Sequence, residues 1–321
     1  MARRKVKLPA HAQHTPTHKM SVWKKIATQK YLYLLILVPF LWYALFVYYP
    51  MTGLMLAFKD FRFVDGIWGS KWIGLTHFRT LFDDYWFPVI LKNTIGLSLL
   101  KLIIGFPAPI IFAILLNELR GNKFKRVVQT VSYLPYFVSW MVVIGILRLM
   151  LTADGGIVNT ILIQLGILDK PVSFMQMESA IWPIAIISDI WKNIGWNSII
   201  YLAAITGINM ELYEAAELDG AGRFGKIWHV TLPGIKPTIV ILFIMGIGSL
   251  FSSNFDQMYM LNTGPVGAVA ETIDTYIYRV GLKNLNYGVG TALTIVRTIV
   301  VFVLVWTTNK FAKLLGEDGI W

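Results

Sequence analysis

The stretch "EAAELDGAGRFGKIWHVTLP", residues 214–233, is the most informative part of the chain. Glutamates recur at helical spacing in and just before its first half, among good helix formers, which predicts a short helix. Asp219-Gly220 is a strong turn signal and should end that helix. A second short amphipathic stretch follows, and we expect it to stop at Leu232-Pro233.

The same stretch contains two partial nucleotide-binding patterns. Its glycines match G-x-G-x-x-G, and the run to Lys226 matches G-x-x-x-x-G-K-[ST] except for Ile227 in the last position. A phosphate loop needs a preceding strand and a Ser or Thr hydroxyl for Mg²⁺, and a dinucleotide site needs a βαβ unit. A helix precedes this loop instead. We therefore expect no nucleotide here, and we expect Lys226 to meet lipid headgroups or a partner surface.

Outside this stretch the chain has the composition of a membrane protein. Of its 321 residues, 56% are hydrophobic and only 15% are charged, whereas a soluble domain carries about 25% charged residues. The chain has no cysteine, which excludes disulfides, thiol catalysis and cysteine metal sites.

Six apolar stretches are long enough to cross a bilayer, which takes about 20 residues each. The six predicted spans are 31–52, 88–116, 127–151, 181–207, 237–262 and 289–309. We therefore predict an all-α integral membrane protein with six transmembrane helices. Its transmembrane domain covers residues 31–309, between a basic tail at 1–30 and a short tail at 310–321.

Lys and Arg residues are distributed unevenly between the two sides of such a topology. Seventeen lie in the two tails and in the loops 117–126 and 208–236, and seven lie in the loops of the opposite side, 53–87, 152–180 and 263–288. Since cytoplasmic segments carry the excess of basic residues, both termini and the loop 208–236 are predicted to be cytoplasmic. The net charge of +11 then reflects topology, and we expect no nucleic-acid partner.

The loop 208–236 also matches a family motif. Glu214-Ala215-Ala216 and Gly220, followed by Leu-Pro at the right distance, resemble the EAA loop of permease subunits of ABC importers. That motif reads EAA, three residues, G, nine residues and I-x-L-P, and Val230 takes the place of the Ile. The resemblance implies a coupling helix that docks on a separate ATPase subunit. The residues implied in this contact are Glu214, Ala215, Ala216, Asp219 and Gly220.

The resemblance covers nearly the whole chain beyond residue 30. The segments "GFPAPIIFAILLNEL", "YLPYFVSW" and "ETIDTYIYRVGL" are similar to permeases for complex oligosaccharides, including those from pectin, rhamnogalacturonan and alginate. This implies a type I ABC importer permease fold in a bacterial cytoplasmic (inner) membrane. The implied partners are a second, homologous permease subunit, two ATPase subunits and an extracytoplasmic solute-binding protein. The chain itself would bind no cofactor, because ATP and Mg²⁺ belong to the ATPase subunits.

Polar residues recur within the predicted spans, where ionisable groups usually face a cavity or a partner. In the fourth span five of them fall at i, i+3, i+4, i+7 and i+8, on one helical face. Indole rings, amides and carboxylates are suited to binding sugars. The residues predicted to line a substrate pathway are Asp189, Lys192, Asn193, Trp196, Asn197, Ser253, Asn254, Asp256 and Arg297.

A structural interpretation of the same residues remains open. Polar side chains also join membrane helices to one another, and Asp189–Lys192 and Asp256–Arg297 would form such ion pairs. The functional interpretation has a sharper form, in which Lys192 and Arg297 attract the carboxylates of an acidic, uronate-containing oligosaccharide.

Two other functions are compatible with a polytopic membrane protein. An ion-coupled secondary sugar transporter commonly shows internal repeats and broken helices, and residues 31–151 and 181–309 show no self-similarity. An intramembrane enzyme would need a cluster of His or carboxylate residues, whereas His77 and His229 are isolated. We therefore predict a non-enzymatic permease, with the ion-coupled transporter as the alternative.

Overall fold

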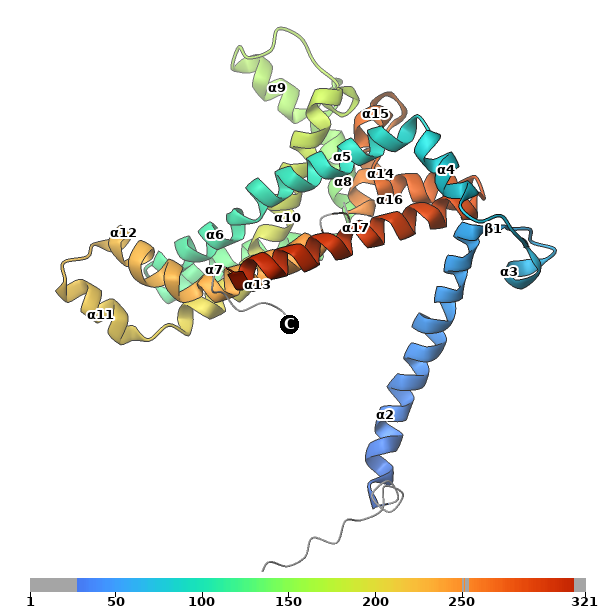
Figure 1. Cartoon of the computed structure of the whole chain (residues 1–321). Helices are drawn as coiled ribbons and strands as arrows, with labels where there is room; N and C mark the ends of the chain where they lie inside the picture. The colour runs from blue at the N-terminus through green and yellow to red at the C-terminus, as the bar shows by residue number, and fades with distance from the viewer. Residues whose placement is uncertain (1–27, 250, 252–253, 315–321) are drawn as a thin grey trace, which may run out of the picture. The chain divides into compact units, whose positions relative to one another are not determined.

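A computed structural model describes residues 28–249, 251 and 254–314. The chain divides into two compact units, residues 1–53 and 54–321. The described part of the first unit is a helical rod of α2 (Lys30–Tyr43), the π-helical η1 (Ala44–Tyr48) and the start of the 3₁₀ segment η2 (Tyr49–Phe58) (Figure 1). α2 and η1 bury no residue. A helix that is apolar all round needs an apolar surrounding, as a bilayer provides.

The described residues of the second unit form helices and one small hairpin, in which β1 and β2 pair antiparallel. Its elements up to the long central helix are β1 (Lys59–Asp60), α3 (Gly66–Gly69), β2 (Lys71–Trp72), α4 (Thr76–Asp83), α5 (Trp86–Leu100), η3 (Lys101–Gly105), α6 (Pro107–Glu118), α7 (Asn122–Tyr133), η4 (Leu134–Phe137), α8 (Trp140–Leu151), α9 (Ile157–Gln164), η5 (Phe174–Gln176) and α10 (Glu178–Thr206). The elements after it are α11 (Met210–Leu218), α12 (Arg223–Lys226), η6 (Ile227–Thr231), α13 (Leu232–Gly248), α14 (Phe255–Leu261), η7 (Gly264–Val266), α15 (Gly267–Ala270), α16 (Ile273–Tyr276), η8 (Ile277–Lys283) and α17 (Tyr287–Leu314).

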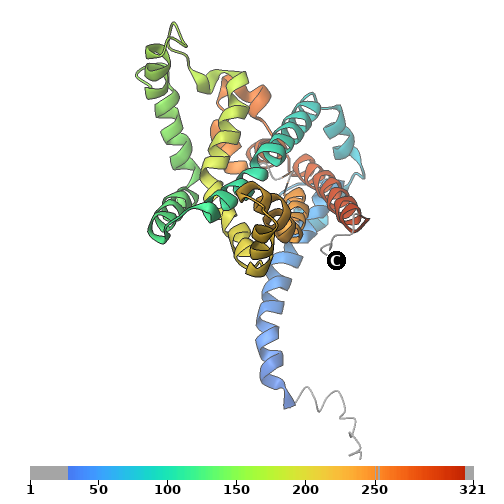
Figure 2. The same cartoon turned by 90° about the vertical axis from the view of Figure 1, so that its left-hand side faces the viewer.

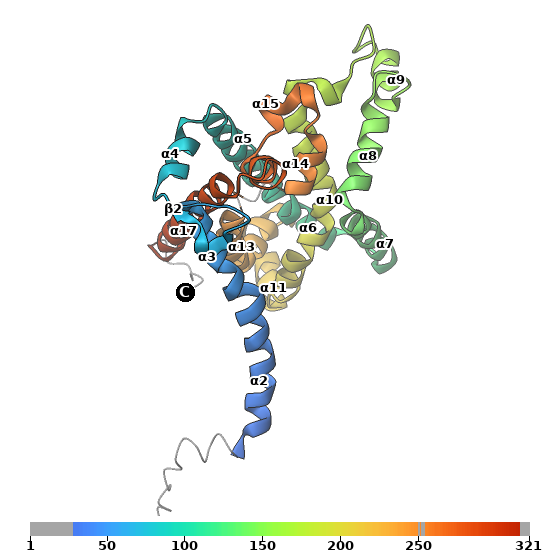
Figure 3. The same cartoon turned by 90° about the vertical axis from the view of Figure 1, so that its right-hand side faces the viewer.

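The helix α10 runs through the middle of this unit and packs on α6, α7 and α13 (Figures 2 and 3). Its first half contributes Ile181 and Ala185 to an apolar cluster with α8 and α14. Its last turns contribute Tyr201 and Ile205 to a second cluster, with α6 and α13. The polar middle of α10 therefore lies between two apolar regions.

One glycine lets α10 approach its neighbour closely. A Cβ atom on Gly195 would lie 2.0 Å from the carbonyl oxygen of Ser132 in α7, a distance that no real Cβ atom adopts. Small residues permit such backbone contacts between membrane helices. The α7–α10 crossing thus depends on Gly195.

Proline shapes several of the long helices. Of the four π-helical segments among the described residues, η1, η3 and η6 each end two residues before a proline: Pro50, Pro107 and Pro233. A proline ring clashes with the carbonyl four residues earlier and removes an N–H. A wider π-helical turn bonds the residue before the proline to the carbonyl five positions back, as between Phe106 N and Lys101 O at 3.1 Å. The helix therefore continues past the proline.

This device makes one prediction from the coupling loop wrong. The second stretch of the loop does not stop at Leu232-Pro233, because η6 absorbs the proline and the helix runs without interruption from Arg223 to Gly248. The fifth helix thus begins well before residue 237.

The end of this helix also differs from the predicted span 237–262. α13 ends at Gly248, and α14 begins only at Phe255. Asn254, which precedes α14, has a positive φ of 52°. Such a left-handed conformation interrupts a helix, and Asn tolerates it better than most residues do. The described residues therefore do not form one continuous helix over 237–262, because α13 ends at Gly248 and Asn254 is left-handed.

The predicted third span, 127–151, is broken as well. The helical run Asn122–Phe137 and the helix Trp140–Leu151 meet at an angle of 99°. Val138 and Ser139 are extended, and the Ser139 hydroxyl caps α8 by accepting from Val142 N at 3.4 Å. A proline at 135 and a serine N-cap explain why one helix ends and another starts here.

By length and apolar composition, four helices among the described residues are able to cross a membrane, or five if the bent pair counts as one span. The four are Lys30–Phe58, Trp86–Glu118, Arg223–Gly248 and Tyr287–Leu314. α10 has 29 residues and is long enough, but its polar side chains keep it outside this count.

Candidate functional site

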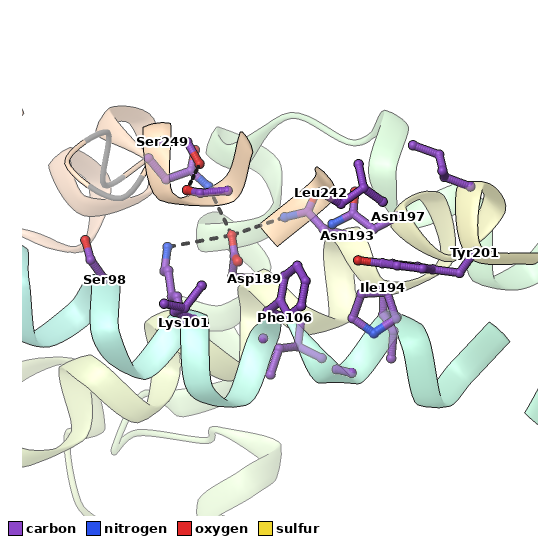
Figure 4. A pocket seen from close by; sticks show the side chains of 18 residues that line it. Ser98, Lys101, Phe106, Asp189, Asn193, Ile194, Asn197, Tyr201, Leu242 and Ser249 are labelled. Atoms are coloured by element: carbon purple, nitrogen blue, oxygen red, sulfur yellow. Dashed lines mark hydrogen bonds and ion pairs between the residues drawn. The ribbon is translucent and has the colours of Figure 1, made fainter. Parts of the chain in front are cut away.

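A polar cavity of about 420 Å³ lies between η3, α6, α10 and the end of α13 (Figure 4). Apolar side chains of α6, α10 and α13 form part of its wall. The polar residues that line it are Ser98, Lys101, Asp189, Asn193, Asn197, Tyr201, Ser249 and Asn254. Four of the predicted pathway residues, Asp189, Asn193, Asn197 and Asn254, are thus brought together.

Asp189 is the centre of the polar contacts in this cavity. Its Oδ1 accepts hydrogen bonds from Asn193 Nδ2 and from Asn254 Nδ2, each at 3.1 Å. The Lys101 ammonium lies 3.7 Å from the same oxygen (Figure 4). One carboxylate therefore connects α10 to η3 and to the residue that starts α14.

Lys101 is a member of this site that was missed in the sequence. Its Nζ donates to Gln257 Oε1 at 2.9 Å. Gln257 is fully buried, and its Nε2 donates in turn to Ala185 O at 2.7 Å and to Ser188 Oγ at 2.9 Å. A lysine near the middle of an apolar stretch is the signal that points to Lys101, since such residues rarely face lipid.

Lys192 lies outside the cavity. Its Nζ donates to Tyr136 O at 2.5 Å and to Pro135 O at 3.3 Å, at the end of η4. The ammonium also lies over the rings of Tyr136 and Trp140, and the residue is 7% exposed. Lys192 thus stabilises the break in the third span. Its predicted role as an attractant of substrate carboxylates does not fit this position.

Trp196, like Lys192, contacts η4 and does not line the cavity. Its ring stacks on Tyr136 with 4.5 Å between centroids, and Phe137 packs edge-on against it. The five predicted residues of α10 spread over about 140° of the helix surface at 100° per residue. That arc is too wide for one cavity, so the i+4 and i+8 residues line the cavity with Asp189, and the i+3 and i+7 residues contact η4.

Asp256 and Arg297 are described and are not part of the cavity lining. Asp256 is exposed at the start of α14. Arg297 of α17 forms an ion pair with Asp274 of α16, so the expected Asp256–Arg297 pair is wrong. Ser253 lies outside the described residues.

The coupling segment is formed by α11, and its end shows why Gly220 is needed. Gly220 has a φ of 81°. Its N–H donates to Glu217 O at 3.0 Å, and the N–H of Ala221 donates to Ala216 O at 2.9 Å. These two bonds form a Schellman motif, which satisfies the last carbonyls of a helix and favours glycine. The glycine thus serves a helix end, as the turn signal predicted.

Two side-chain contacts hold α11 to the base of the fifth helix. The Tyr213 hydroxyl lies 2.9 Å from the Thr231 hydroxyl of η6. The Lys226 ammonium donates to Glu217 at 2.6 Å, and this bond and charge hold the pKa of Glu217 below its usual value. Lys226 therefore pairs within the loop, and the expectation that it meets lipid or a partner stays a prediction.

The outer surface of α11 is open to a partner. Glu214, Ala215, Asp219 and Gly220 are exposed, and Ala216 is half-buried. Large apolar side chains beside them are also exposed; these are Met210, Leu212, Leu218, Phe224 and Trp228. Exposed apolar groups of this number mark an interaction surface.

The fold and cavity define a helical membrane permease. Residues 105–316 match the family described as "Binding-protein-dependent transport system inner membrane component". This match covers more than half of the chain, and the chain belongs to that family. It is a multi-pass permease component of an ABC importer in the inner membrane, and the ATPase is a separate subunit. The ion-coupled alternative is thereby set aside, although the structure does contain broken spans.

Individual relatives extend the similarity to nearly the full length. The polygalacturonan/rhamnogalacturonan transport system permease protein YteP of Bacillus subtilis (strain 168) is 44% identical over 297 residues, 92% of each chain. Protein LplB of the same organism is 38% identical over 91% of each chain.

A solved structure has the same fold. It is the crystal structure of a bacterial alginate ABC transporter in complex with an alginate pentasaccharide-bound periplasmic protein. One of its chains superposes with a TM-score of 0.87 at 37% identity, covering 93% of this chain and 99% of that one.

Proposed function

We propose that this permease translocates an acidic, uronate-containing oligosaccharide that an extracytoplasmic solute-binding protein delivers. A second, homologous permease subunit forms the other half of the pathway, and two ATPase subunits supply the energy. The relatives support this substrate class, because one transports polygalacturonan or rhamnogalacturonan and another imports the acidic polysaccharide alginate. The periplasmic protein in the alginate transporter complex supports the delivery step.

The polar cavity is the observation that carries the proposal. Asn193, Asn197 and Asn254 present amides there, and Ser249 presents a hydroxyl. These groups both donate and accept hydrogen bonds, which suits the hydroxyls of a sugar. Substrate would pass along this wall of α10 when two permease subunits rock against each other.

The topology that fits this function has six crossings. α10 supplies the sixth, shielded by α6, α7 and α13 on its polar faces. The excess of Lys and Arg on one side supports cytoplasmic positions for both termini and for α11. The loops of the other side, which carry α9 and the hairpin β1–β2, are then available to the binding protein.

α11 is the segment that receives the force of ATP hydrolysis. Its exposed Glu214, which is followed by Ala215 and Ala216, would enter a groove on an ATPase subunit. Small side chains permit close approach, and the carboxylate can pair with a basic group there. The apolar residues Leu218 and Phe224 would be covered in the same contact.

The test uses the complete complex in proteoliposomes, with substrate supplied together with the solute-binding protein. Glu214→Arg should abolish substrate-stimulated ATP hydrolysis and uptake while leaving membrane insertion intact. Glu211→Arg, a charge reversal one turn earlier on the same exposed helix, is the matched control and should have a much smaller effect. Normal stimulation in Glu214→Arg would contradict the role of α11.

The substrate class is tested separately by uptake of oligouronates by the wild-type complex. Alanine variants of Asn193 and Asn197 should lower this uptake. A wild-type complex that takes up neutral oligosaccharides but no oligouronate would refute the proposed substrate class.

A further inference from the structure

The position of the Lys101 ammonium is fixed by an amide and not by its counterion. Its Nζ is 2.9 Å from Gln257 Oε1 but 3.7 Å from Asp189 Oδ1, beyond hydrogen-bond distance. The amide group of Gln257 is itself anchored on Ala185 and Ser188. The ammonium would therefore stay in place if Asp189 stopped interacting with it.

Asp189 is likewise held without help from Lys101. Asn193 and Asn254 both donate to its Oδ1, from two different elements. The two charges thus face each other across a gap, each oriented by its own amides. Such a pair interacts by charge while each member keeps capacity for a further ligand.

The geometry points to Lys101 as the group that recognises a carboxylate of the substrate, with Asp189 as its counterion. This inference rests on the proposed function. An ammonium has three N–H donors, and Gln257 takes one of them. The other two lie on the side shared with Asp189, 3.7 Å away, where a ligand carboxylate could also bind, and the side chain is 19% exposed at the cavity wall.

Lys101 is also the one cation among the described residues that line the cavity. The other basic residues within the predicted spans have partners elsewhere or lie at the surface. Lys192 contacts η4, Arg297 pairs with Asp274, and Arg148 donates to Met260 O. Lys92 is exposed on α5. A carboxylate in the cavity would therefore meet Lys101.

Asp189 limits how tightly an acidic ligand binds at this site. A substrate carboxylate that binds Lys101 gains a charge-assisted hydrogen bond and is repelled by the carboxylate of Asp189 nearby. A transported ligand must bind well enough to enter and weakly enough to leave. Asp189 keeps the binding of an acidic sugar reversible, whereas a neutral sugar meets both groups only through hydrogen bonds of its hydroxyls and has no net charge for either group to attract or repel.

The experiment compares uptake of two matched probes by the full complex in proteoliposomes. The first is a trisaccharide of uronates, prepared separately from pectin and from alginate. The second is the methyl ester of each trisaccharide, which has nearly the same size and no charge. Each variant is compared with wild type for each probe, so that any preference of the binding protein cancels.

Lys101→Met should lower uptake of the acid about tenfold or more and uptake of the ester less than about twofold. Lys101→Arg keeps the positive charge and should keep the preference for the acid over the ester. This result separates a role of the charge in recognition from a role of the side chain in folding. Lys92→Met, the same substitution on the same helix away from the cavity, should change neither. Asp189→Asn should lower KM for the acid and lower its kcat, because release slows, without a matching change for the ester.

Equal losses of both probes in Lys101→Met, or unchanged acid kinetics in Asp189→Asn, would overturn this inference alone. Failure of the wild-type complex to carry either probe would overturn the proposed function together with it.

Discussion

The hydroxyls of Tyr213 and Thr231 lie 2.9 Å apart and join the coupling helix α11 to η6 at the base of α13. Thr231 is buried, so its end of the bond is fixed in the helix. The same helix carries Gly246 and Ser249 at the wall of the polar cavity. A displacement of α11 would therefore reach, in part through this hydrogen bond, a helix that extends to the cavity.

Removing this bond should uncouple ATP hydrolysis from transport. Tyr213→Phe deletes one hydroxyl and keeps the ring, with a loss of about 1 kcal/mol of local stability. We expect more ATP hydrolysed per sugar imported, measured with both quantities in the same proteoliposomes. Tyr85→Phe removes a hydroxyl from a ring that is 78% exposed and serves as the control. An unchanged ratio in Tyr213→Phe would show that other contacts carry the coupling.

The end of α11 should be sensitive to one glycine and insensitive to its neighbour. Gly220→Ala forces a Cβ into a φ of 81° and should destabilise the Schellman motif by about 1 kcal/mol. Gly222 has a φ of −72° with no atom within 4 Å of an added Cβ, so Gly222→Ala is the control. Proteolysis of the loop in the purified complex measures the effect, and equal protection in both variants would contradict it.

The α7–α10 crossing should fail when Gly195 gains a side chain. Gly195→Ala places a Cβ 2.0 Å from the Ser132 carbonyl, and backbone on both sides must move. We expect a loss of about 1–3 kcal/mol, seen as a lower Tm in detergent. Gly145→Ala on α8 meets no atom within 4 Å and should be neutral. A Tm for Gly195→Ala within error of wild type would exclude the close approach.

Lys192 should behave as a structural residue. Lys192→Met leaves the carbonyls of Pro135 and Tyr136 without their donor at the bend of the third span. Thermal stability should fall, and uptake of acidic and neutral sugars should fall in the same proportion. A selective loss of the acidic probe would instead restore the role that the sequence had indicated.

Tyr276 should make stability depend on alkaline pH. Burial, together with the hydrogen bond that its hydroxyl donates to Asp84, raises the pKa of Tyr276 well above its usual value near 10. The unfolded chain ionises this phenol first, so its stabilising effect is complete below about pH 10 and is lost as the pH rises from there towards the raised pKa. Tyr276→Phe should lack this loss in Tm measurements against pH, whereas Tyr85→Phe should keep it.

The sequence was sufficient for the class of protein and for the coupling helix. Long apolar stretches, the distribution of basic residues and the EAA motif can each be recognised from residues that are close together in the sequence. Recognising them requires no knowledge of the tertiary packing. The same holds for Gly220, since a helix end needs a residue that tolerates positive φ. Asp189, Asn193 and Asn197 were found because i, i+4 and i+8 always share a face.

The sequence did not reveal where the predicted membrane helices are bent or interrupted. Hydropathy averages over a window, so a bend at Ser139 or a break before Asn254 leaves the average apolar. Pro233 predicts a helix end from sequence alone, whereas the π-helical turn η6 lets the helix continue past it. Lys101 lies far from Asp189 in sequence, and only the packing of η3 on α10 brings the two charges together.

The polarity of α10 has a consequence for how the protein is made. In the six-crossing arrangement that we propose, a translocon would offer this segment to the lipid with Asp189 and Lys192 still unpaired. Partitioning of such a segment is unfavourable by several kcal/mol for two central charges. α10 would therefore remain at the translocon until α6 or α13 is beside it. Biogenesis of this permease would then be ordered by one helix whose two central charges oppose its entry into the bilayer alone.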